Sequence, residues 1–365
     1  MERFSQKFLV GGFLAILFGL LMLHLILPDA EASVSERRKL AKPPQLTLES
    51  VRDGAFFTDA ESYLLDHFPF RDGFRTGKAL YAYGVLHALD NNGVYLHDGA
   101  AYKLEYPLHE DQVSYAAALM ERLCGTLLTE NNRAFYAIIP DKNYYVAAQN
   151  GYPSMDYARL FSLVRETLLT PEEVPLADLL GAEDYYRTDL HWRQERLLPV
   201  AQRLAAALGV EIDGEAAYRT QSFGAFHGAY YGQAALPLAP DELLYLTSAV
   251  TDAGTVTSLE AEGTSGVYTP EAFDGMDAYD VFLSGAAALL TVENPLAQTE
   301  RELILFRDSF GSSLAPLLLS GYRRVTLVDL RYIASSELEK YIDFDDQDVL
   351  FLYSTQILNG GAMLR

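Results

Sequence analysis

Three side chains with the chemistry of a serine nucleophile and its base stand out in the sequence. Asp189 lies two residues before His191, and Trp192, the only tryptophan, follows the histidine directly. Ser309 comes much later, where the apolar run 303–306 breaks into Arg-Asp-Ser-Phe-Gly. A serine hydroxyl needs a base to remove its proton, and an imidazole needs a carboxylate to fix its tautomer. We therefore interpret Ser309 as a nucleophile, His191 as its base and Asp189 as the orienting acid.

Two local structures must position these side chains. A strand that ends in a tight turn and opens a helix displays Ser309 at the carboxyl edge of a sheet, with the helix N-terminus near a developing oxyanion. An extended loop lets Asp189 reach the ring nitrogen of His191 that faces away from Ser309. The alternative is that Asp308 and Ser309 only cap a helix and that His191 is a hydrogen-bonded core residue.

The order of the expected elements is typical of a parallel α/β sheet. We expect strands over 133–139, 174–180, 303–306, 324–329 and 349–353. We expect helices over about 111–128, 155–168, up to 208, 310–319 and 335–342, with Pro199 bending the third or displacing its start. Residues 211–300 interrupt this order with many Gly, Tyr, Thr and Ser, so we expect an insertion that lines one side of the site.

The N-terminal region predicts a membrane anchor. Residues 8–27 are apolar over a length that can span a bilayer, and Arg3 and Lys7 precede them. This pattern predicts a cytoplasmic tail over 1–7, a stalk over 28–50 and an α/β domain over 51–365 outside the cytoplasm. The alternative is a signal peptide cleaved after Ala32, which would release a secreted protein.

Composition excludes several classes of function. The formal net charge of −22 argues against binding to nucleic acid and against electrostatic adhesion to anionic lipid. The single Cys124 cannot form an intramolecular disulfide. No two of the seven histidines have helical ligand spacing and there is no cysteine cluster, so we expect no metal site and no cofactor.

Six short motifs follow one another along the chain, from Asp66 to Asp72, Asn92 to Tyr95, Pro140 to Lys142, Thr188 to Trp192, Phe306 to Phe310 and Val328 to Tyr332. They occur in the order seen in the bacterial DHHW proteins, which look like relatives of the alginate O-acetyltransferases, and the chain resembles that family over about residues 50 to 356.

The resemblance implies an SGNH-hydrolase-like three-layer α/β sandwich with a mainly parallel sheet and a circularly permuted motif order. In that family Ser309 matches the nucleophile, His191 the base and Asp189 its acid. Two positions depart from the family pattern. Leu190 replaces the first histidine of the family name, and Arg307 stands where ordinary SGNH hydrolases have glycine, which puts the glycine-supported oxyanion geometry in doubt.

The function implied by the resemblance is transfer of an acyl group, acetyl by preference, to or from a cell-envelope polysaccharide. A membrane-embedded partner protein would supply the acyl group. Arg331, Tyr186 and Lys142 are candidates for oxyanion or substrate binding, although a structural salt bridge or core hydroxyl explains each of them as well. Two alternatives remain open: an esterase that uses the same triad, and a catalytically silent glycan-binding scaffold.

Overall fold

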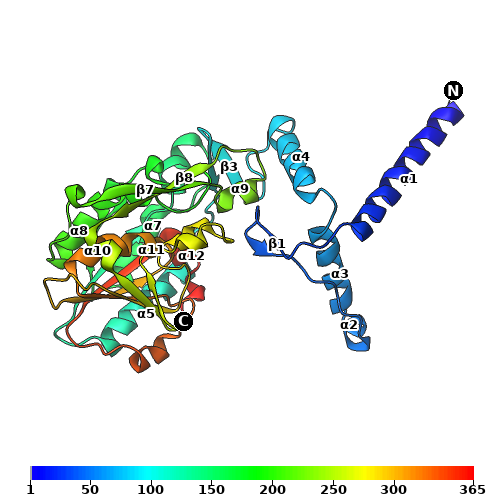
Figure 1. Ribbon diagram of the computed structural model, residues 1–365. Helices are drawn as coiled ribbons and strands as arrows, with labels where there is room; N and C mark the ends of the chain where they lie inside the picture. The colour runs from blue at the N-terminus through cyan, green and yellow to red at the C-terminus, as the bar shows by residue number, and fades with distance from the viewer. Residues whose placement is uncertain (1) are drawn as a thin grey trace. The chain divides into compact units, whose positions relative to one another are not determined.

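The computed structural model describes residues 2–365, and the chain divides into two compact units (Figure 1). The first unit holds the residues up to 92 together with 231–237, and the second holds 93–230 and 238–365. Each unit is described by itself.

The second unit is built on an eight-stranded sheet with the order β10-β9-β11-β13-β12-β14-β5-β6. Strands β13, β12, β14, β5 and β6 run parallel, whereas β11, β9 and β10 add to the β13 edge in antiparallel fashion. Their bounds are β5 Arg133–Ile139, β6 Glu172–Glu173, β9 Thr255–Ser258, β10 Thr264–Gly266, β11 Leu289–Glu293, β12 Glu302–Arg307, β13 Arg324–Val328 and β14 Asp348–Ser354.

Helices cover both faces of this sheet, which gives three layers. Side chains alternate along a strand, so Phe135 and Ile139 of β5 join the core beneath helices α8 (Leu198–Leu208) and α11 (Phe310–Leu318). Tyr136 and Ile138 point the other way and join the core beneath α5 (Glu110–Leu127) and α7 (Tyr157–Thr167). The central strands are therefore buried on both faces, which explains their uninterrupted apolar sequence.

Shorter elements surround this core in the second unit. Two antiparallel hairpins are formed by β3 with β4 and by β7 with β8. The bounds are β3 Val94–His97, β4 Ala100–Lys103, α6 Asn143–Val146, β7 Arg219–Phe226, β8 Asp241–Thr247, α10 Ala249–Ala253 and α12 Thr355–Asn359. Helix α9 spans Ala229–Ala234.

The first unit contains one helix long and apolar enough to cross a membrane, α1 (Glu2–Ile26). The segment 28–50, which the sequence assigns to a stalk, holds the small hairpin of β1 (Ala32–Ser33) and β2 (Arg38–Lys39) and the start of α2 (Leu48–Arg52). Helices α3 (Ala55–Asp66) and α4 (Arg71–Gly84) follow.

The expected fold class, a mixed α/β fold around a mainly parallel sheet, is confirmed. Several local predictions are wrong. Residues 174–180 do not form a strand, because Pro175 lacks an N–H donor, and pairing with β5 is limited to β6 before a 3₁₀ turn at Ala177–Leu179. The helix expected over 335–342 is a 3₁₀ segment, Ser335–Lys340. The region 211–300 is more than an insertion beside the sheet, since it contributes β9, β10 and β11 to it.

Candidate active site

The turn that carries Ser309 is fixed by the carboxylate of Asp308. Strand β12 ends at Arg307 and α11 begins at Phe310. One oxygen of Asp308 accepts the Phe310 N–H at 3.0 Å, and the other accepts the Ser354 N–H at the end of β14 at 2.8 Å. Asp308 is buried, while Ser309 remains partly exposed. The turn is thus tied to the neighbouring strand, and the serine hydroxyl stays reachable.

The segment that carries Asp189 and His191 is a narrow loop closed by an antiparallel bridge between Tyr185 and Trp192. The Trp192 indole N–H donates to the carbonyl of Phe310 at 3.1 Å and to the Ser313 hydroxyl at 2.9 Å. The tryptophan therefore holds this loop against the first turn of α11, next to Ser309.

A continuous line of hydrogen bonds joins the three candidate side chains. The His191 Nε2 atom lies 2.8 Å from the Ser309 Oγ, and its Nδ1 lies 2.6 Å from Asp189 Oδ1. Asp189 is fully buried and His191 is 4% exposed. When Nδ1 donates to the carboxylate, Nε2 is left as the acceptor for the serine O–H. This is the tautomer that a general base requires.

The second oxygen of Asp189 is held by the segment 228–229, which sequence reasoning did not assign to the site. It accepts the Ala229 N–H at 2.7 Å. Gly228 packs so closely that an added Cβ would lie 2.3 Å from the Cβ of Asp189. Thr188 reinforces the same junction, because its hydroxyl accepts the Gly228 N–H and donates to Asp241. The sequence signal that could have assigned this segment to the site is Gly228, which small and aromatic residues follow within the expected insertion.

Tyr279 is a second side chain that the sequence did not single out. Its ring stacks on the imidazole of His191 with centroids 3.8 Å apart and planes 4° from parallel. Its hydroxyl donates to Ser313 at 2.6 Å. Phe310 also contacts the imidazole, with ring centroids 5.1 Å apart. These rings exclude water from the histidine and fix its plane, so Nε2 points at Ser309.

Lys142, a candidate for oxyanion or substrate binding, lies behind the Asp189 loop. Its Nζ donates to the carbonyls of Tyr186 and Arg187 at 2.9 and 3.3 Å, and it lies over the rings of Tyr102 and Tyr230. Burial lowers the pKa of Lys142 to about 7, although the nearby carboxylates of Asp189, Asp241 and Asp141 oppose that shift. The geometry is that of a support for the loop backbone.

Tyr186 and Arg331, the other two candidates, also make no hydrogen bond to Ser309 or to the His191 ring in the described chain. The Tyr186 ring packs edge-on against Phe226, and within residues 2–365 its buried hydroxyl has no hydrogen-bond partner. Arg331 binds Asp329 through two hydrogen bonds, Nε to Oδ1 at 2.8 Å and Nη2 to Oδ2 at 2.6 Å.

Arg307 is buried beneath the nucleophile turn. Its Nη1 lies 3.7 Å from Asp329, while its Nε and Nη2 have no hydrogen-bond partner in the described residues. Burial lowers the pKa of this guanidinium. An added Cβ at Gly311 would lie 2.6 Å from the Arg307 Cβ, so the glycine of α11 accommodates the arginine. The arginine therefore does not obstruct the contact between Ser309 and His191.

The backbone donors around Ser309 are fewer than the helix N-terminus suggested. The Phe310 N–H is taken by the Asp308 carboxylate and the Gly311 N–H by the Asp308 carbonyl at 3.1 Å. The N–H of Ser309 itself has no hydrogen-bond acceptor within residues 2–365. This backbone group is available to donate to an oxyanion that forms beside the Ser309 hydroxyl.

A cavity of about 650 Å³ lies beside the loop that carries Asp189 and is lined in part by Tyr185, Tyr186 and Arg187 of that loop. Its walls include Tyr102, Lys142, Tyr186, Arg187 and Arg193. Asp189, His191 and Ser309 do not line it, so it is not the space in which the triad would act. The part of the chain that the structure describes shows no group of three or more His, Cys, Asp or Glu side chains that could hold a metal ion.

Comparison with known proteins gives a clear answer at the level of the fold. No model of a protein family and no curated protein matches the sequence. A DHHW family protein from Eubacterium siraeum matches 75% of this chain and 94% of its own, with 20% identity and a TM-score of 0.62. Bacillus cereus PatB1 with a sulfonyl adduct matches 73% of this chain and 95% of its own, with 18% identity and a TM-score of 0.58. At these identities the likeness establishes a shared fold.

Proposed function

We propose that the chain is a membrane-anchored acyltransferase, acting outside the cytoplasm, that moves an acetyl group onto a cell-envelope polysaccharide. The observation that carries the proposal is the line of hydrogen bonds from Ser309 through His191 to Asp189. A reachable hydroxyl bonded to a buried imidazole, itself bonded to a buried carboxylate, is the arrangement of a serine acyl-transfer site.

The reaction proceeds in two transfers through one acyl-enzyme. His191 Nε2 accepts the Ser309 proton as Oγ attacks the carbonyl carbon of an acyl ester, and the resulting imidazolium returns that proton to the leaving alcohol. A sugar hydroxyl then loses its proton to His191 and attacks the acyl-enzyme, which restores the serine. Asp189 stabilises the imidazolium in both transfers, and the Ser309 N–H donates to the oxyanion.

The proposed location follows from α1. Its segment Gln6–Ile26 is apolar throughout, and Arg3 and Lys7 at its start favour a cytoplasmic N-terminus. The second unit then lies outside the cytoplasm, where acyl-CoA is not available, so a membrane-embedded protein must supply the acyl group. Arg331 and Tyr186 remain candidates for contacts to the polysaccharide.

The test is trapping of the acyl-enzyme. The full chain in detergent is mixed with a chromogenic acetyl ester, quenched and weighed by intact mass spectrometry. An aryl sulfonyl fluoride serves as a second probe, because the PatB1 structure described above carries a sulfonyl adduct. We expect one adduct on the wild type and on Ser162→Ala, which removes a serine of α7 that is partly exposed as Ser309 is, and none on Ser309→Ala.

Addition of polysaccharide acceptors then separates the possible outcomes. Movement of the acetyl group from the trapped enzyme to a sugar hydroxyl supports the transferase. Loss of the adduct to water at the same rate with and without acceptor identifies an esterase. Absence of any adduct on a protein whose Trp192 fluorescence shows it to be folded would favour a silent scaffold.

A further inference from the structure

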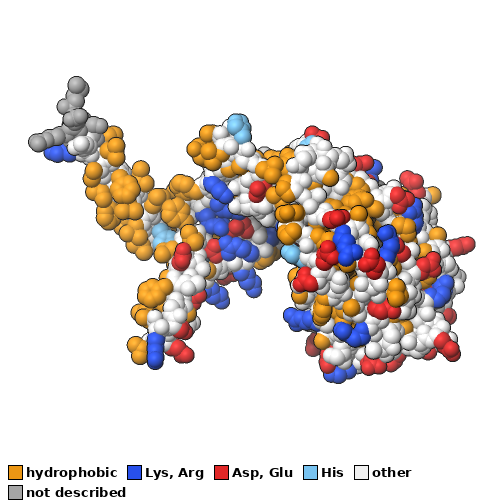
Figure 2. Space-filling model, turned by 180° about the vertical axis from the view of Figure 1, so that it is seen from behind, with side chains coloured by type: hydrophobic (Ala, Val, Ile, Leu, Met, Phe, Trp, Pro, Cys, Tyr) orange, Lys and Arg blue, Asp and Glu red, His pale blue; other side chains and the backbone are white. Residues whose placement is uncertain are grey.

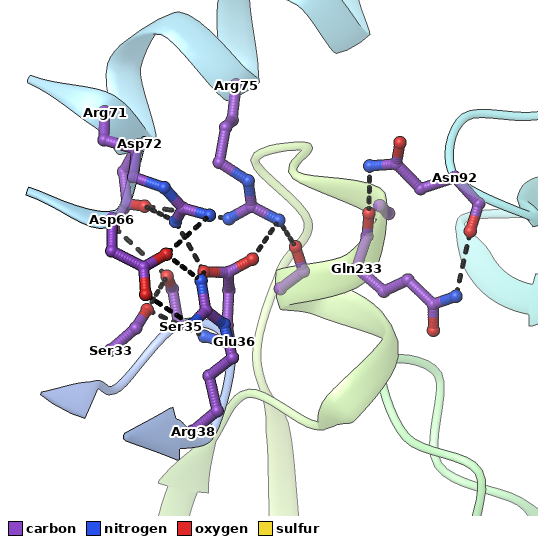
Figure 3. Close-up of polar contacts among 12 residues, drawn as sticks. Ser33, Ser35, Glu36, Arg38, Asp66, Arg71, Asp72, Arg75, Asn92 and Gln233 are labelled. Carbon is purple, nitrogen blue, oxygen red and sulfur yellow. Dashed lines mark hydrogen bonds and ion pairs between the residues drawn. The ribbon is translucent and has the colours of Figure 1, made fainter. Parts of the chain in front are cut away.

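The first unit is held together by a network of ion pairs around Glu36 and Asp66 (Figure 3). Arg71 and Arg75 of α4 both bind the Glu36 carboxylate, and Arg38 binds Asp66 at the end of α3. The pKa of the Asp66 carboxyl is held below its ordinary value, chiefly by its hydrogen bonds to Arg38. This network fixes α4 to the hairpin of β1 and β2.

The basic side chains of α4, which are Arg71, Arg75 and Lys78, all make their polar contacts on one side of that helix. Besides its contact with Glu36, Arg75 donates to the carbonyl of Gly232 at 2.7 Å. Lys78 donates to Asn91 at 2.6 Å, and Asn92 with Gln233 continues the same polar surface (Figure 3). These partners all belong to the first unit.

The neighbouring side of α4 is apolar and exposed. We define the apolar face of α4 as Phe70, Phe74, Leu80, Tyr81 and Val85, which share one arc of the helix at 3.6 residues per turn. Their exposed fractions are 67%, 57%, 52%, 55% and 61%. The remaining positions on this arc, 73, 77 and 84, are glycines, so the arc carries no charge. Side chains of this kind are rarely left in water without a partner.

Contacts within the unit connect this helix to the end of α1. The His24 Nδ1 lies 3.1 Å from the carbonyl of His67, and the Tyr63 hydroxyl donates to Asp29 at 2.8 Å. Phe68, just after α3, contacts the Phe74 ring with centroids 5.5 Å apart. The apolar face of α4 therefore adjoins Phe68, and the segment of residues 63–68 is hydrogen-bonded to the end of α1. Figure 2 shows apolar side chains along α1 and again on the helices after it.

Charge distinguishes this region from the rest of the chain. Residues 28–92 contain eight Lys or Arg and ten Asp or Glu, so they are close to neutral although the whole chain has a formal charge of −22. The repulsion from anionic lipid that the composition predicts thus arises almost entirely from the second unit. An aromatic, uncharged face with basic side chains at its border suits the interfacial layer of a bilayer.

We propose that the apolar face of α4 lies in the interfacial layer of the same bilayer that α1 crosses. The inference rests on the proposed anchoring by α1 and not on the acyl-transfer chemistry. Because α1 already tethers the unit, even a weak lipid contact is made at high effective concentration. The membrane then holds the first unit at two places, by a span and by a surface helix.

The test uses the full chain in vesicles of phosphatidylcholine, with and without phosphatidylglycerol. A nitroxide spin label is attached to Phe74→Cys or Val85→Cys, and its accessibility to oxygen and to a water-soluble nickel complex is compared. Native Cys124 does not compete, because it is buried and burial raises its pKa to about 12. Phe13→Cys in α1 is the bilayer reference, and Glu300→Cys, on a side chain that is 93% exposed, is the water reference.

We expect the labels at 74 and 85 to favour oxygen over nickel, as the label at 13 does and the label at 300 does not. Nickel accessibility equal to that at 300 would overturn the inference. So would dipolar broadening that disappears on dilution with unlabelled chain, since that result would mean a second copy covers the face. If the label at 13 also reports water, the anchoring itself has failed, whereas acyl-enzyme formation at Ser309 is read independently.

Discussion

Asp189 shows how much of the candidate site depends on contacts that no short motif contains. One of its oxygens accepts from the His191 ring and from the His191 backbone N–H, and the other accepts from Ala229. The Asp-x-His spacing in the sequence accounts for the first two contacts. The third contact comes from Ala229, which lies 40 residues after Asp189 in the sequence.

Gly228 is the residue that permits this third contact, so Gly228→Ala should impair the site. Its new methyl group would lie 2.3 Å from the Cβ of Asp189, and the carboxylate must move. Because misplacement of a catalytic group by about 1 Å costs on the order of 10²-fold in rate, we expect kcat for ester cleavage to fall by about that factor. Gly125→Ala, at a helical glycine with open space around it, is the control and should leave kcat unchanged. Equal rates for the two variants would contradict this account.

Lys142 should make stability depend on pH. Its pKa is lowered from 10.5 to about 7 by burial, so between these values the unfolded chain binds more protons than the folded protein. Stability of the wild type should therefore rise with pH in that window, by up to about 1.4 kcal/mol per pH unit, and Lys142→Met should lose this dependence. Urea midpoints read from Trp192 fluorescence at several pH values check it. Parallel curves for the two proteins would remove Lys142 as the cause.

At the scale of elements, the nucleophile turn is a junction between two strands. The Asp308 carboxylate bridges the start of α11 and the end of β14, so the position of Ser309 depends on both. In Asp308→Asn one of the two backbone N–H groups would face an amide NH₂ and lose its acceptor. We expect a loss of about 1–3 kcal/mol in unfolding free energy and a slower acylation of Ser309.

Asp346→Asn, at an exposed carboxylate in the loop before β14, is the matched control for this prediction. It should change neither the urea midpoint nor the rate of acylation. If Asp308→Asn acylates as fast as the control, the bridge between α11 and β14 does not set the position of the serine.

The elements that the sequence predicted well are those whose burial is two-sided. Runs such as 134–139 and 303–306 are apolar at every position because helices cover both faces of the sheet, and β5 and β12 include those positions. The segment 174–180 is also mostly apolar, but it contains Pro175 and Asp178 and follows the edge strand β6, where Pro175 ends the pairing. Composition reports burial in both cases and cannot report strand pairing.

In the candidate site, too, some residues could be recognised from the sequence and others could not. Motif spacing indicated Asp189, His191 and Ser309, and the structure places these three side chains in hydrogen-bond contact. Their catalytic roles remain predictions until an acyl-enzyme is trapped. Tyr279 and Gly228 could not be recognised, because an aromatic ring over an imidazole and a missing Cβ beside a carboxylate are products of tertiary packing.

At the scale of the whole molecule, the core stabilises the second unit without any disulfide, and Cys124 offers a way to measure this. The thiol is 4% exposed within the α5 core, and burial raises its pKa to about 12. We expect a maleimide to modify Cys124 only as the unit unfolds, with labelling across a urea series following the Trp192 signal. An added cysteine at Glu300 should react at once in native protein. Rapid native labelling of Cys124 would show that α5 opens locally.

The order of strands in the sheet also determines when the sheet can be completed while the chain is being synthesised or translocated. Strand β14 lies between β12 and β5, yet it is the last of the eight strands along the chain. A chain that emerges from a ribosome or a translocation pore with its N-terminus first leaves both neighbouring strands with open edges until residues 348–354 arrive. Ser309 lacks its anchor at Ser354 over the same interval. The newly made chain therefore stays exposed to wrong strand pairing, and the turn that carries Ser309 stays incompletely held, until β14 has been made.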